Sequence, residues 1–518
     1  MHSLTPLARP QRTTPVVDVG VPMMVTAFFA FTSSYDVSTS QFVAAFLLSW
    51  MPWAAYRNWL RGDRDKIPLF VLLAGMFWLA YGVPLFWGKH VVTGVFGLRV
   101  LTESAITGAL YLAILGVVCL WLGMRVAARS RWFPRIRADV SNTPNRWNYL
   151  RAIFVVGTLV KTLVPITAFG AGGRQIVSNF ENIVPVVAFA IFVRYYLRGR
   201  TLQFDNLLIY GYGLVALVVG ISSGWLGSFV SVGIICGVVY IYERRKFPAM
   251  AALIVLPVIL FFQPAKQAFR GRYWKEESSD TSIERVSFWV ENSWQLWGKA
   301  LIGQDAEQLK DLSDATLSRL SLLQQTANVI ELTPSRVPYQ YGSMYSYIFV
   351  TFVPRFLWPD KPSVNDANRW YQVTYGLTDT RQLSSVSIAV GTVAESYINF
   401  GWVGPALIIF PLGIFLGSFE RIFLHPDSSL LLSGLGAVLV PQLLAIESQM
   451  AEYVAGLTQQ IALVLLVLVP TLESQERKKD PGRPIPAPHT LKPEILTSPP
   501  KIPRNTVVCE NSSSKYPV

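Results

Sequence analysis

The run SAITGALYLAILGVVCLWLGM, residues 104–124, contains no charged side chain. A helix of about 20 apolar residues crosses the ~30 Å hydrocarbon core of a bilayer and satisfies its own backbone hydrogen bonds there. Similar apolar runs recur along the chain and predict an all-α, polytopic integral membrane protein with about twelve transmembrane helices. The predicted spans are 16–34, 41–57, 67–87, 104–124, 151–169, 182–198, 206–223, 228–242, 248–264, 402–419, 428–446 and 452–471.

Composition supports a membrane protein. The 518 residues are 52% hydrophobic and 15% charged, with a mean hydropathy of +0.37. Soluble domains carry about 25% charged residues. The net charge of +13 alone could suggest a nucleic-acid partner.

The distribution of the basic residues argues against nucleic acid. They gather in alternate connections between the spans, the pattern of positively charged cytoplasmic loops. Residues 264–400, by contrast, hold 13 Lys and Arg against 14 Asp and Glu, so their net charge is 13 − 14 = −1. We therefore expect both termini to be cytoplasmic. The basic groups are Arg9 and Arg12; Arg57, Arg61, Arg64 and Lys66; those from Arg125 to Arg151; Arg198 and Arg200; Arg244, Arg245 and Lys246; Arg421; and Arg477, Lys478 and Lys479.

The spans divide the chain into four parts. Residues 1–263 form a membrane domain of nine spans, 264–401 a large extracytoplasmic loop, and 402–471 three further spans. The tail, 472–518, is rich in proline and cannot bury enough apolar surface to fold, so we expect it to be disordered. Within the loop, residues 286–330 have the spacing of amphipathic helices on the membrane or capping the spans, and 345–358 predicts an interfacial or re-entrant segment.

A first group of cations follows the ninth span directly. Lys266 and Arg270 are four residues apart, and Arg272 and Lys275 three, so each pair would share a helix face. Arginine binds phosphate through two parallel hydrogen bonds, which suits a lipid diphosphate at the outer interface. The alternative is a solvated stretch neutralised by the acidic residues within 276–280.

Further cations are candidates for the same ligand. Arg355 and Lys361 lie in a loop whose prolines restrict the backbone, with Asp360 and Asp366 as possible ion-pair partners and Arg369 and Arg381 further along. Arg174 lies in a predicted outer turn, where solvation explains it equally well. Lys161 lies ten residues into its predicted span, where a charge is costly and usually faces a cavity or a partner.

Glu395 is the candidate catalytic carboxylate. It lies in the apolar setting of GTVAESYINFGWVG, just before the tenth span. Burial would raise its pKa and suit it to act as a general base. A purely structural role remains open, and Glu447 and Glu452 on the last outer hairpin are competing candidates.

No cofactor or metal is expected. Cys119, Cys236 and Cys509 offer no convincing disulfide, and the four histidines lack the spacing of metal ligands. The sequence contains no phosphate-binding glycine loop, serine elbow, dinucleotide turn or acidic pair of the kind that holds a metal for nucleotide-sugar transfer.

Two segments resemble the Wzy-type O-antigen polysaccharide polymerases, which join oligosaccharide repeat units in bacteria. They are VPRFLWPDKP (Val353–Pro362), with Asn365 downstream, and GTVAESYINFGWVGPALIIFPLGIFLG (Gly391–Gly417). Members of that family have a similar outer loop bearing proline and tryptophan. It is followed by a Glu–x–Tyr–x–Asn–Phe–Gly block that leads into a glycine-rich span.

The resemblance implies metal-independent glycosyl transfer at the outer face of the bacterial inner membrane. A glycan on undecaprenyl diphosphate would be moved onto the next lipid-linked repeat unit. Its partners would be that substrate, membrane lipids and a chain-length regulator protein. Arg270, Arg272 and Arg355 would hold the leaving diphosphate, and Glu395 would activate the acceptor hydroxyl. Such families often carry an arginine in a glycine- and serine-rich turn before a span. Residues 221–231 here have none, which leaves Arg174 as a substitute.

Three other functions fit parts of the pattern. An O-antigen ligase would share the large outer loop and the chemistry. A transporter or flippase of lipid-linked glycans would instead line a midplane cavity with charges. A non-catalytic assembly protein would use the arginines only to bind anionic polymer. Convergence of Arg270, Arg272, Arg355 and Glu395 on one outer pocket would favour an enzyme, and their scatter the assembly protein.

Overall fold

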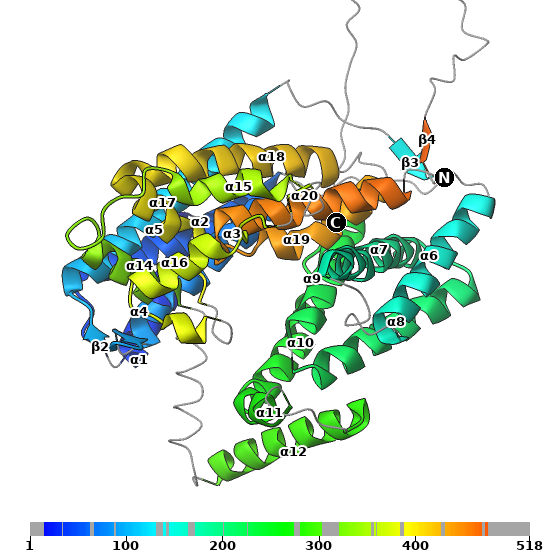
Figure 1. Ribbon diagram of the computed structural model, residues 1–518, viewed down its shortest axis with the longest axis horizontal. Helices are drawn as coiled ribbons and strands as arrows, with labels where there is room; N and C mark the ends of the chain where they lie inside the picture. The colour runs from blue at the N-terminus through cyan, green and yellow to red at the C-terminus, as the bar shows by residue number, and fades with distance from the viewer. Residues whose placement is uncertain are drawn as a thin grey trace, which may run out of the picture. The chain divides into compact units, whose positions relative to one another are not determined.

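The chain is mostly α-helical, with two short two-stranded sheets (Figure 1). The compact unit is Met1–Gln475. The computed structural model describes residues 15–33, 35–62, 67–87, 90–130, 138–140, 144–163, 171–199, 201–224, 226–273, 280–302, 321–353, 357–358, 360–383, 388–425, 430–468 and 472–474. The predicted disordered tail therefore lies outside the described residues, except for 472–474.

The first half of the chain contributes ten α-helices and the hairpin β1–β2. They are α1 (Pro15–Thr32), α2 (Thr39–Arg61), α3 (Leu69–Phe77), the π-helix η1 (Trp78–Gly82), α4 (Pro84–Trp87), β1 (Val91–Gly94), β2 (Gly97–Val100), α5 (Glu103–Arg129), β3 (Ala138–Val140), α6 (Pro144–Leu163), α7 (Ala171–Leu197), α8 (Gln203–Ser222), α9 (Leu226–Arg244) and α10 (Ala249–Phe262).

The second half begins inside the predicted outer loop. Its elements are α11 (Lys266–Tyr273), α12 (Ser282–Leu301), α14 (Leu322–Leu332), η3 (Ser343–Tyr345), α15 (Ser346–Thr351), α16 (Asp366–Thr374), η4 (Thr380–Gln382), α17 (Thr392–Phe400), η5 (Gly401–Val403), the π-helix η6 (Pro405–Ile409), α18 (Phe410–Phe423), α19 (Leu430–Leu443), α20 (Met450–Leu468) and β4 (Leu472–Ser474). Strand β4 pairs with β3, so the first residues of the predicted tail are ordered.

Five helical segments in the described part of the chain are long and apolar enough to cross a membrane. They are Leu69–Trp87, Glu103–Arg129, Phe180–Leu197, Gln203–Ser222 and Pro405–Phe423, and three shorter apolar helices are Val16–Thr32, Leu432–Leu443 and Met450–Leu466. The prediction of an all-α protein with several membrane-spanning helices is confirmed at this level. The number twelve and the loop layout stay predictions.

Helices α5 and α18 pack against each other through glycines (Figure 1). A Cβ atom on Gly123 would lie 2.2 Å from the carbonyl oxygen of Phe410, and one on Gly413 would lie 2.4 Å from that of Leu120. A Cβ atom on Gly417, one turn after Gly413, would lie 2.8 Å from the Cα of Met124. Small residues at this spacing let two membrane helices approach backbone to backbone.

The same pair of helices runs in parallel. Gly116 lies against Ile409 near the start of the contact, and the Arg421 guanidinium donates to the carbonyl of Ser130 at its end. The alternation of basic connections gives the predicted spans 104–124 and 402–419 this same direction.

Side chains at separate helix ends, all predicted to be cytoplasmic, form hydrogen bonds with one another in the structure. Glu243 on α9 accepts hydrogen bonds from Arg194 and Arg198 on α7, and Arg194 also donates to Ser433 on α19. The phenol of Tyr242 donates to the carbonyl of His425 at 2.7 Å. Three helices that are distant in sequence are thus tied together at one end.

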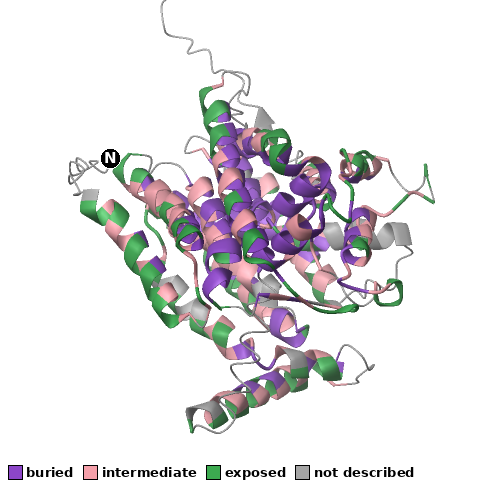
Figure 2. Cartoon of the chain, turned by 90° about the vertical axis from the view of Figure 1, so that its left-hand side faces the viewer, coloured by how far each residue is buried: buried purple, intermediate pink, exposed green. Residues whose placement is uncertain are grey.

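The predicted outer loop is partly built into the helical core. Helix α14 packs on α5, η1 and α17, and most of its residues are buried. Figure 2 shows the buried residues concentrated where these helices meet. Helices α11 and α12 instead share a second apolar cluster with α8 and α10, in which Trp289 is fully buried and donates to the carbonyl of Phe262 at 2.9 Å. The amphipathic helices predicted within 286–330 correspond to α12 and α14, with 303–320 outside the described residues.

Candidate functional site

Helix α17 carries Glu395 and is buried from Thr392 to Asn399. Glycines with positive φ bound it at both ends, Gly391 at 76° and Gly401 at 60°, a backbone conformation that glycine adopts without strain. The amide of Thr392 donates to the carbonyl of Ile446 at 3.1 Å, which fixes the start of the helix to the α19–α20 connection.

The Glu395 carboxyl is completely buried, and only one of its two oxygens forms a hydrogen bond to a described residue. Its Oε2 accepts a hydrogen bond from the backbone amide of Met450 at 2.7 Å. Its Oε1 has no hydrogen-bond partner among the described residues. Burial raises the pKa of Glu395 to about 8, against the opposing effect of the Met450 amide. A carboxyl in this position exchanges a proton near neutral pH.

Two further buried polar atoms without a partner lie on segments that contact this carboxyl. The Tyr345 hydroxyl in η3 makes no hydrogen bond of normal geometry to a described residue, and the Oε1 of Gln449, the residue before Met450, has none. Burial, and then the negative charge of Glu395, raise the pKa of Tyr345 well above its usual value. Buried polar groups are nearly always paired, so this cluster has room for a bridging water or a ligand hydroxyl.

Asn399 holds the helix and the neighbouring turn together. Its Nδ2 donates to the carbonyl of Glu395 at 2.8 Å, while its Oδ1 accepts from the amide of Gly342 at 2.9 Å. The carbonyl of Asn399 accepts from the amide of Tyr341 at 3.1 Å. The turn that carries Tyr345 is therefore positioned by the same helix that carries Glu395.

Helix α16 supports the segment that leads into α17. The Asn368 Oδ1 accepts from the amide of Val390 at 3.1 Å, and the Gln372 Oε1 accepts from that of Ile388 at 3.0 Å. These buried amides, like Tyr345, Asn399 and Gln449, were not predicted as site residues. Asn399 follows apolar residues and was recognisable as a polar residue in such a setting, whereas Asn368, Gln372 and Gln449 have polar neighbours in the sequence and gave no local signal.

The competing carboxylates differ from Glu395. Burial also raises the pKa of Glu447 and of Glu452, but both residues keep exposed surface, whereas Glu395 has none. Among the described residues, no group of three or more His, Cys, Asp or Glu has the arrangement of a metal site. The buried carboxyl at position 395 is thus the one predicted base that the structure places in an apolar, partly unsatisfied environment.

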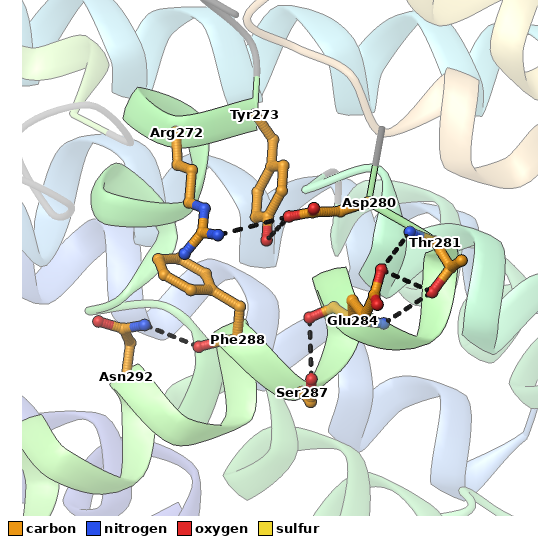
Figure 3. Close-up of polar contacts among 8 residues, drawn as sticks. All are labelled: Arg272, Tyr273, Asp280, Thr281, Glu284, Ser287, Phe288 and Asn292. Carbon is orange, nitrogen blue, oxygen red and sulfur yellow. Dashed lines mark hydrogen bonds and ion pairs between the residues drawn. The ribbon is translucent and has the colours of Figure 1, made fainter. Parts of the chain in front are cut away.

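Arg270 and Arg272 lie on α11, away from this packing. Figure 3 shows the Arg272 guanidinium over the ring of Phe288, 4.6 Å from its centroid, and directed at Asp280, 3.4 Å from the carboxylate. Tyr273 donates to the same carboxylate at 3.0 Å. The described side chains around α11 and around α17 belong to separate apolar clusters, so the structure does not bring these arginines and Glu395 together.

The other predicted cations are distributed differently. Lys361 donates to the carbonyls of Val350 and Val353, at 3.3 and 2.8 Å, and so closes the end of α15. Lys161 donates to the Oδ1 of Asn182 at 3.1 Å. Arg355 and the side chain of Arg174 lie outside the described residues.

These observations define the class: a helical protein with several apolar helices of membrane-spanning length and a buried, partly unsatisfied carboxyl beside them. Comparison with known families matches residues 93–420 to a domain of unknown function, DUF8712. The match covers more than half of the chain, from within β1 to within α18, and the protein belongs to this family. No curated protein and no solved structure matches the sequence.

Proposed function

We propose that the protein is a membrane glycosyltransferase that polymerises oligosaccharide repeat units carried on undecaprenyl diphosphate. Glu395 carries the proposal, because its carboxyl is fully buried, has a pKa of about 8, keeps one oxygen unpaired among the described residues and acts electrostatically on Tyr345. The resemblance of Gly391–Gly417 to the Wzy-type polymerases supplies the reaction. The bacterial inner membrane is the location that this function requires.

The chemistry needs a base and a stabilised leaving group. The acceptor hydroxyl attacks the anomeric carbon, whose bond to the diphosphate oxygen breaks, and the hydroxyl proton passes to the Glu395 carboxylate. General bases contribute roughly 10²–10⁴ in rate. The diphosphate leaves with its charge, and a cation near it lowers the barrier. Among the arginines predicted to hold the diphosphate, Arg355 is the nearest to Glu395 in sequence.

A non-catalytic assembly protein is the second candidate. The separate packing of Arg270 and Arg272, with Arg272 paired to Asp280, favours it, because these arginines then bind anionic polymer or stabilise α11 and α12 without meeting Glu395. A ligase that transfers finished glycan uses the same chemistry as the polymerase and differs only in its acceptor.

The experiment is polymer length by gel in a host deleted for this gene. Wild type, Glu395→Gln and the exposed control Glu447→Gln are compared at matched expression. We expect single repeat units in the deletion and in Glu395→Gln, and long chains with wild type and Glu447→Gln.

The other outcomes separate the candidates. Long chains in the deletion strain refute the polymerase, and long chains still attached to their lipid carrier identify a ligase. Loss of polymer in the deletion together with normal chains in Glu395→Gln removes Glu395 from catalysis and favours the assembly protein.

A further inference from the structure

A groove of about 690 Å³ lies beside the first turns of α5, next to the helix that carries Glu395. One wall of the groove is formed by the amino-terminal end of α5, and the opposite wall is formed by η5. The lining residues are Glu103, Ser104, Thr107, Gly108, Tyr111 and Trp402.

The groove combines open aromatic surface with hydrogen-bonding groups. Tyr111 and Trp402 are 41% and 48% exposed. The Thr107 hydroxyl accepts from the Nε2 of Gln41 at 3.2 Å, which leaves its own hydrogen free to donate. Glu103 and Ser104 are exposed at the rim. Apolar ring faces next to a carboxylate and hydroxyls match the two kinds of surface on a sugar, its C–H face and its hydroxyl edge.

Trp402 is held in place rather than loose. Its ring meets that of Tyr397 edge to face, with centroids 5.9 Å apart and planes at 90°. Tyr397 is two residues after Glu395 on α17 and is itself buried. The aromatic wall of the groove is therefore coupled to the helix of the candidate base.

The position of the groove along α5 places its rim at the end of a candidate membrane span, Glu103–Arg129. Its 27 residues span about 40 Å at 1.5 Å per residue, roughly 10 Å more than the hydrocarbon core. At the far end, Arg125 stacks on Trp121 at 4.6 Å, and such residues mark a membrane boundary. From Trp121 back to Glu103, α5 is about 28 Å long, close to the thickness of the hydrocarbon core. The rim of the groove at Glu103 and Ser104 therefore lies at the opposite membrane boundary, where head groups and glycans are within reach.

We infer that this groove binds a sugar ring of the lipid-linked glycan. The source of that glycan rests on the proposed function, whereas the recognition rests on the groove itself. An anionic head group is disfavoured because Glu103 repels it, and an acyl chain is disfavoured because it would desolvate the same carboxylate.

The test measures binding without catalysis. The probe is the host's repeat-unit oligosaccharide, released from its lipid by mild acid, and binding to protein in nanodiscs is followed by saturation-transfer NMR. We expect wild type and Trp294→Ala, which removes a 72% exposed tryptophan outside the groove, to bind equally. Trp402→Ala should weaken binding at least about tenfold, as expected for an aromatic anchor. Glu103→Gln should weaken it too, and Trp402→Phe should retain most of it.

Each outcome is decisive for one claim. Unchanged binding in Trp402→Ala and Glu103→Gln overturns the inference and leaves Trp402 as a membrane-boundary residue. Glu103 lies on the exposed rim, so Glu103→Gln should not disturb the fold. Its effect on binding can therefore be interpreted even if Trp402→Ala disturbs the packing against Tyr397. Groove-dependent binding in a protein whose deletion leaves long polymer upholds the inference while the proposed function fails. If the deletion loses polymer but binding does not depend on the groove residues, the proposed function stands and the inference about the groove fails.

Discussion

At the scale of single residues, Glu395 shows how a side chain is made reactive by its surroundings. The carboxyl is fully buried, one oxygen accepts a hydrogen bond from the amide of Met450, and the other has no hydrogen-bond partner among the described residues. An isolated buried carboxylate is costly, so its neutral form is favoured and its pKa rises. The same feature that suits it to proton transfer must therefore affect stability.

Glu395 predicts a pH dependence of stability with a definite sign. Between its ordinary value of 4.5 and about 8, the folded protein binds a proton that the unfolded chain has released. Stability therefore falls as pH rises through this window, by roughly 5 kcal/mol at most. Glu395→Gln stays neutral and should flatten this fall, while Glu291→Gln, at an exposed site on α12, should not. Thermal unfolding of the detergent-purified protein across that pH range checks it, and parallel wild-type and Glu395→Gln curves would contradict it.

Asn399 gives a second prediction at this scale. Replacing it with alanine removes the acceptor of the Gly342 amide and the donor to the Glu395 carbonyl. An unsatisfied buried donor costs about 1–3 kcal/mol. Asn399→Ala should lower the melting temperature and weaken the positioning of Tyr345. Asn292→Ala, which removes one hydrogen bond on the surface of α12, is the control and should change the melting temperature far less.

At the scale of elements, the α5–α18 pair depends on the absence of side chains. A methyl group on Gly413 would meet the carbonyl of Leu120 at 2.4 Å, which is backbone and cannot move aside alone. We expect Gly413→Ala to destabilise the protein by about 1–3 kcal/mol through overpacking. Gly211→Ala on α8 meets nothing within 4 Å and should be neutral or slightly stabilising, because alanine favours helix. Equal melting temperatures for the two variants would show that α5 and α18 are not in close contact.

Elements also show what the sequence could and could not predict. The apolar run of α5 and the position of Glu395 before a span were recognisable from residue type alone. Helix α14 was expected to lie on the membrane or cap the spans, because residues 286–330 have the spacing of amphipathic helices. In the structure Thr326 bonds Tyr81 at 3.3 Å, and Asn328 accepts from Arg99 at 3.0 Å. These partners are more than 200 residues away, so no local pattern could identify α14 as a core helix.

The candidate site was also only partly predictable, because its contacts join residues that are distant in the sequence. The sequence indicated a carboxylate in an apolar setting, but the amide that binds it belongs to Met450, 55 residues later. The arginines were grouped with Glu395 because all fall within the predicted outer loop. Residues on one side of a membrane need not share a pocket, and α11 packs with α12 instead.

At the scale of the whole molecule, the arrangement of charge predicts which ends face the cytoplasm. The structure joins the ends of α7 and α9 to the start of α19 through Arg194, Glu243 and Ser433, and all three ends are predicted to be cytoplasmic. Glu395 and the α19–α20 connection meet at the ends predicted to be outside. One orientation of the bundle thus accounts for both groups of contacts.

This orientation is testable by labelling in intact cells. In a cysteine-free background, Thr380→Cys lies on the exposed η4 of the predicted outer side, and Gly62→Cys lies at an exposed position with open space around it in a predicted cytoplasmic connection. A membrane-impermeant maleimide should label Thr380→Cys at once and Gly62→Cys only after permeabilisation, because the basic residues near position 62 stay on the cytoplasmic side. The reverse pattern would invert the topology, moving Glu395 and the groove at Trp402 to the cytoplasmic face, where a nucleotide-activated donor would have to replace the lipid-linked one.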